Sequence, residues 1–290
     1  PDVLSISWGW NEMDQCGIDG PGCAPGTTSE EYVRRANTEF MKLAARGLTL
    51  VASAGDAGAP GRTDEGCNNN PVLNPAFPAS SPWVVAVGST QFETDPPLAN
   101  ASATDAPWAI GGHVGEKNCD LSSGCGYTSG SGFSDLNPPG SWVGETVSGY
   151  LSDPRAYKPE SFNRSGRAYP DVTALGSIHY YTVVNNQTMA VGGTSASAPL
   201  VAAMLSHVVS ALGRPLGAGN PFLYRMAADC EACFARQNLP LGWSNCTEED
   251  CCATGYGSGS NVTWDPVYGL GLPRVSAWID YAISNEETPL

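Results

Sequence analysis

The chain has 290 residues, of which 41% are hydrophobic and only 15% are charged. Its 29 acidic residues outnumber the 14 basic ones, and the net charge of -15 argues against nucleic acid as a partner. No apolar run is expected to reach the length of a membrane span, which argues against a membrane partner, and the length suits one large α/β domain over residues 1–290.

The first elements form a predicted βαβ unit. Residues 3–9 (Val-Leu-Ser-Ile-Ser-Trp-Gly) predict a buried strand, and residues 29–46 predict a helix with Ser29 as its N-cap. The next strand, over 48–52, leads into Ser53-Ala54-Gly55-Asp56. A strand, a helix and a second strand in this order favour a parallel sheet.

The later elements are separated by long loops. Residues 83–88 predict another strand, whereas residues 93–160 are polar and rich in Gly, Ser and Pro. A hairpin is expected over 180–190, followed by a helix that runs from a turn at Gly193 to about residue 212. Residues after 220 are expected to be mostly loop until 276–279.

Ten cysteines indicate an oxidising compartment. Cys16 with Cys23, and Cys119 with Cys125, are spaced for short disulfide-closed loops, while the pairing of the other six stays open. A zinc site at residues 230–233 ranks below a disulfide, because no second pair of ligands accompanies the Cys-x-x-Cys motif.

Five N-glycosylation sequons together with the cysteines favour passage through the secretory pathway. The chain starts with Pro1-Asp2 and enters an apolar strand at once, as expected of a processed or truncated N-terminus. The sequons begin at Asn100, Asn163, Asn186, Asn245 and Asn261.

Ser195 and Asp56 are the candidate reactive residues. The run Gly193-Thr194-Ser195-Ala196-Ser197-Ala198-Pro199 predicts a turn that places Ser195 at the entrance of a helix. Backbone N–H groups and the helix dipole there suit a nucleophile whose product is an oxyanion, although a plain N-cap explains the same pattern. Asp56 follows a parallel strand directly, where the sites of open sheets form.

A proton acceptor for a Ser195 nucleophile is not evident in this chain. His207 lies twelve residues further along the same predicted helix, roughly 18 Å along its axis, and cannot reach the hydroxyl. His113 and His179 lie in loops with no evident orienting carboxylate. Three possibilities remain open: the base is a carboxylate, it lies in sequence not present here, or the chain is not catalytic.

Several motifs together resemble the sedolisins, which are serine-carboxyl peptidases with a subtilisin-like fold. They are the Gly-Thr-Ser-x-Ser-x-Pro run, Ser53-Ala54-Gly55-Asp56, and residues 35–50, 77–84 and 165–172. The likeness runs from Pro1 to about residue 280. It implies a single peptidase domain of α/β class, with a mostly parallel sheet flanked by helices on both faces.

The resemblance also implies roles for individual residues. Ser195 matches the nucleophile, and Asp56 matches an oxyanion-site aspartate, which can donate a hydrogen bond only when protonated and therefore implies action in acid. Gly130, Ser131 and Gly132 match a strand that pairs with an extended peptide substrate. The family's general base is a glutamate oriented by an aspartate four residues later, upstream of the first strand. We therefore expect this pair on a separate upstream chain or segment.

The family has a calcium site near its C-terminus. Asp265 matches one of its two aspartates, and the other falls on Asn238, which lacks the charge and should weaken Ca²⁺ binding. Backbone carbonyls of Leu239, Asn261 and Thr263 would complete the site.

Three hypotheses of function follow. The first is an acid peptidase acting through Ser195 in a lysosomal, vacuolar or secreted setting, which by resemblance releases tripeptides from N-termini. The second is a catalytically inactive peptide-binding or structural glycoprotein derived from this fold. The third is a true subtilisin with an upstream histidine, against which Asp56 counts, since true subtilisins carry asparagine there.

Overall fold

A mostly parallel five-stranded sheet lies at the centre of the fold. The computed structural model describes residues 1–18, 22–69, 72–93, 115–143, 145–177, 180–236, 239–260 and 262–285. Strands β1, β3, β5 and β9 are paired in parallel, and β6 pairs antiparallel with β5. Their bounds are β1 (Val3–Ile6), β3 (Thr49–Ser53), β5 (Val85–Phe92), β6 (Glu116–Asn118) and β9 (Val172–Leu175).

The predicted βαβ unit is confirmed, with one change at the start of its helix. Helix α1 (Ser29–Ala45) is capped by Thr28 rather than by Ser29. Thr28 Oγ1 accepts the Glu31 N–H, and the Glu31 carboxylate accepts the Thr28 N–H, which is a capping box. Ser29 Oγ instead accepts the N–H of Cys16 at 3.1 Å and ties the preceding loop to the helix.

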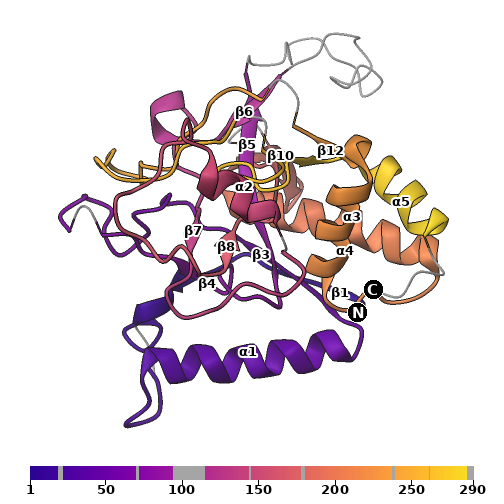
Figure 1. The fold of residues 1–290 in the computed structure, drawn as a ribbon, viewed down its shortest axis with the longest axis horizontal. Coiled ribbons are helices and arrows are strands. Elements are labelled where there is room, and N and C mark those ends of the chain that lie inside the picture. The colour runs from indigo at the N-terminus through magenta and orange to yellow at the C-terminus, as the bar shows by residue number, and fades with distance from the viewer. Residues whose placement is uncertain are drawn as a thin grey trace.

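Helices cover both faces of the sheet, as expected (Figure 1). Helix α1 lies alone on one face, while α3 (Thr194–Leu212), α4 (Gly219–Asp229) and α5 (Val275–Ser284) lie together on the other side. Leu50 and Ala52 of β3 pack in one apolar cluster with α1 residues, whereas Val51 belongs to the cluster that contains the α3 side chains. Alternate residues of β3 thus face opposite layers, which is why the whole strand is buried.

Helix α3 corrects the expectation that no apolar run is long enough to span a membrane. Among the described residues it is the helix whose 19-residue length and apolar composition satisfy that test. In the structure it packs against β1, β3, β5 and β9, and its Val201, Leu205 and Val208 are fully buried. Its hydrophobicity is accounted for by its place in the core.

The region after residue 220 is less irregular than predicted, because residues 219–229 form α4. Pro221 lies in the first turn of α4, where a backbone N–H has no intrahelical acceptor and its loss costs little. The hairpin expected over 180–190 is confirmed as β10 and β11. The remaining elements are β2 (Trp10–Asn11), η1 (Glu12–Asp14), β4 (Ala76–Phe77), η3 (Leu121–Ser123), β7 (Gly132–Phe133), α2 (Thr146–Ser152), β8 (Ala168–Tyr169), β10 (Tyr180–Val184), β11 (Gln187–Val191), η4 (Glu231–Cys233), β12 (Phe234–Ala235) and β13 (Leu272–Pro273).

All ten cysteines form disulfides. The two short loops predicted from spacing are confirmed, and the Cys-x-x-Cys motif is a disulfide rather than half of a zinc site. One bond joins residues that are 185 positions apart in the sequence. The pairs are Cys16–Cys23, Cys67–Cys252, Cys119–Cys125, Cys230–Cys233 and Cys246–Cys251.

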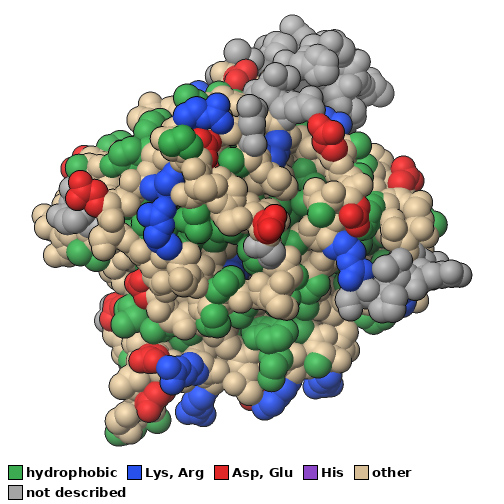
Figure 2. Space-filling model, in the orientation of Figure 1, with side chains coloured by type: hydrophobic (Ala, Val, Ile, Leu, Met, Phe, Trp, Pro, Cys, Tyr) green, Lys and Arg blue, Asp and Glu red, His purple; other side chains and the backbone are tan. Residues whose placement is uncertain are grey.

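Charged side chains are interspersed on the face shown in Figure 2, where Asp and Glu lie among Lys and Arg rather than in one patch of a single sign. Pairs within α1 show the same mixing, since Glu30 lies 2.5 Å from Arg34 and Glu39 lies 2.7 Å from Lys42. On this face charges of the two signs therefore lie side by side rather than in separate patches.

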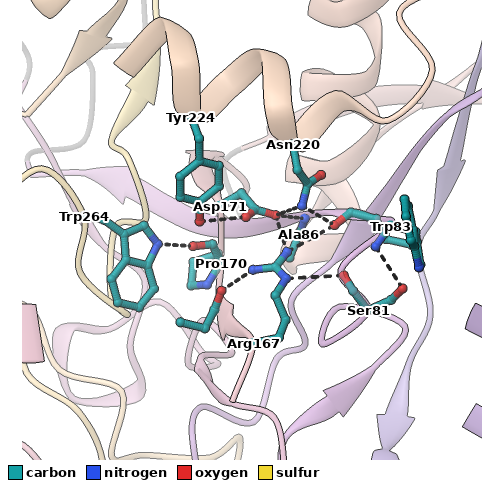
Figure 3. A network of polar contacts seen from close by, with 11 residues as sticks. Ser81, Trp83, Ala86, Arg167, Pro170, Asp171, Asn220, Tyr224 and Trp264 are labelled. Atoms are coloured by element: carbon teal, nitrogen blue, oxygen red, sulfur yellow. Dashed lines mark hydrogen bonds and ion pairs between the residues drawn. The ribbon is translucent and has the colours of Figure 1, made fainter. Parts of the chain in front are cut away.

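One ion pair lies inside the core and fixes the start of β9 (Figure 3). The Arg167 guanidinium lies 2.5 Å from Asp171, and both side chains are almost completely buried. Asp171 also accepts the Ala86 N–H at 2.7 Å and the Tyr224 hydroxyl at 3.0 Å. Trp264 donates its indole N–H to the neighbouring Pro170 carbonyl at 2.8 Å. These bonds join β5, β9, α4 and the C-terminal loops around one buried carboxylate.

Candidate active site

Ser195 is the second residue of α3, so its hydroxyl lies at the amino end of the helix. The N-cap position belongs to Gly193, which has no side chain with which to cap the helix. The alternative interpretation of Ser195 as a plain N-cap is therefore wrong. Its Oγ instead donates to the Ser7 carbonyl oxygen at 3.1 Å, just beyond the end of β1.

Ser7 makes a second contact with the same residue. Its Oγ donates to the Ser195 carbonyl oxygen at 3.0 Å. In a regular helix the N–H of the residue four positions later would occupy that carbonyl, but Pro199 has no N–H to give. The hydroxyl of Ser7 thus satisfies an acceptor that Pro199 leaves open. Sequence analysis missed Ser7 because the two partners are 188 residues apart.

The Asp56 carboxylate is held by Thr194, the residue before Ser195. Its Oδ1 accepts the Thr194 N–H at 2.7 Å and the Thr194 hydroxyl at 2.8 Å. Gly193, which precedes Thr194, has φ +118°. A Cβ there would lie 2.9 Å from Asp56 Oδ2, so a side chain does not fit. Oδ2 makes no hydrogen bond to the described residues, and Arg62 Nη2 lies 3.8 Å from it.

Ser195 and Asp56 line one cleft of 170 Å³ at the carboxyl ends of β1 and β3, together with Ser7, Trp8 and Arg62. The Arg62 guanidinium lies over the Trp8 ring, 5.2 Å from its centroid. Trp8 is 59% exposed, so the rim of the cleft offers an aromatic surface, while the Arg62 guanidinium is paired with Glu248 at 2.9 Å. The structure thus brings the two predicted catalytic residues together from sequence positions 139 apart.

Among the described residues, the only hydrogen-bond acceptor for Ser195 Oγ is the Ser7 carbonyl. His207 lies on the exposed side of α3, and His113 and His179 lie outside the described residues. A backbone carbonyl cannot act as a general base, because it does not hold a proton near neutral or acid pH. The predicted need for a proton acceptor from elsewhere is unchanged.

The predicted substrate strand, residues 130–132, lies beside Asp56 but does not line the cleft. Gly130 donates its N–H to the Gly55 carbonyl at 2.8 Å, and a Cβ on Gly130 would lie 2.1 Å from the Ala54 carbonyl oxygen. Ser131 is 1% exposed, and Gly132 pairs with Tyr169 between β7 and β8. Close approach to the chain's own backbone thus accounts for Gly130, and a substrate role for the segment stays a prediction.

Of the predicted calcium ligands, Asp265, Leu239 and Thr263 line one cavity of 1010 Å³, while Asn238 and Asn261 lie outside the described residues. The Asp265 carboxylate is surrounded by N–H donors and by the Arg236 guanidinium, whose Nη2 lies 2.7 Å from Oδ2. Calcium needs oxygen atoms whose lone pairs point at it, and both Asp265 oxygens already accept N–H groups, so the Asp265 carboxylate as placed does not fit the ion. Sequence analysis missed Arg236, although it lies only two positions before Asn238.

The geometry can be compared with known proteins. The model of the subtilase family matches residues 1–219. The chain belongs to the subtilase family. The resemblance to sedolisins is confirmed by physarolisin of Physarum polycephalum, 37% identical over 292 residues, which cover 95% of this chain and 48% of that protein. Tripeptidyl-peptidase 1 of Homo sapiens is 37% identical over 287 residues, covering 96% of this chain and 42% of that protein.

A solved structure supports the fold. Pseudomonas sedolisin, a serine-carboxyl proteinase complexed with two molecules of pseudo-iodotyrostatin, matches with a TM-score of 0.67 and 22% identity. The match covers 98% of this chain and 66% of that one, and it confirms the subtilisin-like α/β fold. The chain spans about half the length of the curated relatives it matches.

Proposed function

We propose that the protein containing this chain is an acid serine-carboxyl peptidase that cleaves peptide bonds through Ser195. The observation that carries the proposal is the shared cleft, in which the Ser195 hydroxyl and the Asp56 carboxyl are linked through Thr194. Tripeptidyl-peptidase 1, a relative that is named as a peptidase and whose match covers 96% of this chain, supports the same chemistry.

The proposed chemistry assigns one task to each group. Ser195 Oγ attacks the peptide carbonyl carbon and gives its proton to an acceptor, and the carbonyl oxygen becomes an oxyanion. The Thr194 and Ala196 N–H groups already donate to Asp56 and to the Gly193 carbonyl, so the Ser195 N–H is the amide at the start of α3 that can donate to that oxyanion. Asp56 Oδ1 already accepts two hydrogen bonds, so a proton on this carboxyl belongs on Oδ2, which can then donate as well. The acceptor passes this proton to the leaving nitrogen as the tetrahedral intermediate collapses and the C–N bond breaks, which releases the amine. Water then hydrolyses the acyl ester, which frees the acid and restores the Ser195 hydroxyl.

Three further parts of the proposal rest on the resemblance. The proton acceptor is a glutamate, oriented by an aspartate, on a segment or chain outside residues 1–290. The substrate is a peptide, and the name of tripeptidyl-peptidase 1 favours release of tripeptides from N-termini. An acidic lysosomal, vacuolar or secreted setting suits a protonated Asp56, and five disulfides suit an oxidising route to that setting.

A non-catalytic role, as a peptide-binding or structural glycoprotein, is the second candidate. It is favoured by the lack of any acid or imidazole partner for Ser195 Oγ within the described residues. The two candidates differ in whether the full-length protein carries the missing base.

The deciding experiment measures peptide hydrolysis by the full-length protein between about pH 3 and pH 8. Ser195→Ala is expected to lower kcat roughly 10⁶-fold, because the nucleophile is lost. Ser206→Ala is the matched control, since Ser206 lies on the same helix and, within the described residues, its hydroxyl bonds only to the Ala202 carbonyl. Equal turnover by Ser195→Ala and wild type would refute the peptidase proposal, and so would an inactive wild type with a folded Ser195 helix.

Glycosylation is proposed at Asn186, the sequon asparagine at the tip of the β10–β11 hairpin. Asn186 is exposed, with φ +60, whereas Asn245 is half-buried and donates its Nδ2 to the Cys252 carbonyl at 2.9 Å. We expect the secreted protein to carry a glycan at Asn186, removed in Asn186→Gln and retained in Asn245→Gln. Peptide mapping after glycosidase treatment checks this, and an unmodified Asn186 peptide would contradict it.

A further inference from the structure

Arg236 and Asp265 form an ion pair where the resemblance to sedolisins implies calcium. Arg236 follows β12 directly, and its Nη2 lies 2.7 Å from Asp265 Oδ2. Its Nη1 donates to the Gly269 carbonyl oxygen. The guanidinium therefore joins a carboxylate and a backbone carbonyl, which are the two kinds of oxygen that bind calcium in proteins.

The Asp265 carboxylate has no lone pair directed at a second cation. Oδ1 accepts the N–H groups of Val267 and Tyr268, both at 2.8 Å. Oδ2 accepts the Gly259 N–H at 3.3 Å in addition to the Arg236 bond. Within the part of the chain that the structure describes, no three His, Cys, Asp or Glu side chains gather to replace these contacts with metal ligands.

Burial makes a positive partner for Asp265 necessary. The Asp265 side chain is 1% exposed, while Arg236 reaches it from a position that is 20% exposed. A buried carboxylate is costly unless it is paired and hydrogen-bonded, and here both conditions are met by protein groups. A divalent ion bound to the same oxygens would lie beside the guanidinium and be repelled by it.

The ion pair also supports the turn that packs on β9. Leu270 donates its N–H to the Asp171 carbonyl at 2.7 Å. Gly269 has φ +58, and a Cβ there would lie 2.5 Å from the Asp171 carbonyl oxygen, so the turn backbone lies directly against that residue. Arg236 holds this turn from the other side through the Gly269 carbonyl.

We infer that Arg236 supplies, as a permanent part of the chain, the positive charge that calcium supplies in sedolisins. The stability of this protein is therefore independent of calcium. The inference concerns folding and holds whether or not the protein is a peptidase.

Wild-type protein tests the inference first. Thermal unfolding is recorded in EDTA and in millimolar CaCl2, and bound calcium is measured by atomic emission after dialysis. We expect the same Tm in both buffers and no stoichiometric calcium. A Tm that rises with calcium, or about one tightly bound calcium per chain, would overturn the inference.

Variants test the role of the charge. Arg236→Ala is expected to lower Tm by roughly 5–15 °C, because it leaves a buried carboxylate unpaired. Arg274→Ala is the matched control, since Arg274 is exposed and lines the same cavity. Equal Tm values for the two variants would overturn the inference. If Arg236→Ala does not fold, the calcium measurements on the wild type still decide.

Discussion

The Asp56 carboxyl is held by Thr194, the residue before Ser195, and this arrangement decides which of its oxygens can act as a hydrogen-bond donor. Thr194 donates twice to Oδ1, so Oδ2 is the oxygen left to carry a proton. In the proposed mechanism Oδ2 donates to the oxyanion only when it carries a proton. An asparagine at this position would donate at every pH, as in the subtilisins that the third hypothesis invokes.

Substitutions of Asp56 should therefore distinguish the ability to donate a hydrogen bond to the oxyanion from the need for a protonated carboxyl. Asp56→Ala is expected to lower kcat roughly 10²–10³-fold, the usual effect of removing one oxyanion donor. Asp56→Asn is expected to keep more activity than Asp56→Ala, because an amide side chain can also donate a hydrogen bond to the oxyanion. The measurement is kcat against pH for all three proteins. If Asp56→Ala and Asp56→Asn had the same kcat at every pH, Asp56 would not be a donor to the oxyanion.

Ser7 and Arg236 show what residue-level sequence analysis could not find. That Ser195 and Asp56 are candidate site residues could be predicted, because a short motif and its place before a helix or after a strand single out each one, and the structure places both in one cleft. The contacts of Ser7 with Ser195, and of Arg236 with Asp265, join residues 188 and 29 positions apart. No local pattern indicates such a partner, so these residues became visible only when the fold placed them together.

Among the secondary-structure elements, β9 depends most clearly on one buried charge. Arg167 directly precedes β8 and Asp171 directly precedes β9, and Asp171 also bonds to β5 through Ala86 and to α4 through Tyr224. Asp171→Asn leaves the buried guanidinium without a counter-charge. We expect a loss of about 3–5 kcal/mol in the free energy of unfolding.

Chemical denaturation measures this loss, with Glu39→Gln as the control. Glu39 is paired with Lys42 on the surface of α1, where both side chains are more than half exposed. Such pairs contribute about 0.3–0.5 kcal/mol or less. Similar unfolding midpoints for Asp171→Asn and Glu39→Gln would contradict the role assigned to the buried pair.

The elements that sequence patterns predicted well share a feature. Helices α1 and α3, β3 and the β10–β11 hairpin have regular periodicity and clear ends, so local chemistry determines them. Helix α4 was missed because Gly219-Asn220-Pro221 is typical of a loop. Phe222, Leu223 and Met226 of α4 are buried in the core. This packing, rather than the residues at the start of the helix, explains why the helix forms.

Across the whole molecule, several carboxyl groups favour the folded state in acid. Glu12 is completely buried and accepts the hydroxyls of Ser80 and Ser134 at 2.8 and 2.7 Å. Burial raises the pKa of Glu12 above its ordinary 4.5, and the nearby Asp135 raises it further. Burial also raises the pKa of Glu116 and of Asp135. Because these groups hold protons more tightly when folded, their contribution to stability is complete below their ordinary values and is lost as the pH rises through the raised ones.

The fold is therefore expected to melt at a higher temperature near pH 4.5 than near pH 7.5. Asp153 has the opposite effect on stability in acid, since hydrogen bonds from Arg155 lower its pKa. The three carboxyl groups with raised pKa values outweigh this one group. Calorimetry at several pH values checks the trend. Glu12→Gln should flatten it, whereas the exposed control Glu30→Gln should not. A Tm that rises from acid to neutral pH would contradict the prediction.

The Cys67–Cys252 bond has a consequence for how this protein responds to cleavage. It connects positions 185 residues apart, so the backbone between them forms a covalently closed loop. A single cut anywhere within that loop leaves the two fragments attached to each other through sulfur. Molecules cut in this loop would migrate as one species on a gel run without a thiol, and their fragments would separate only after reduction. A single band on a non-reducing gel therefore does not show that the backbone is unbroken.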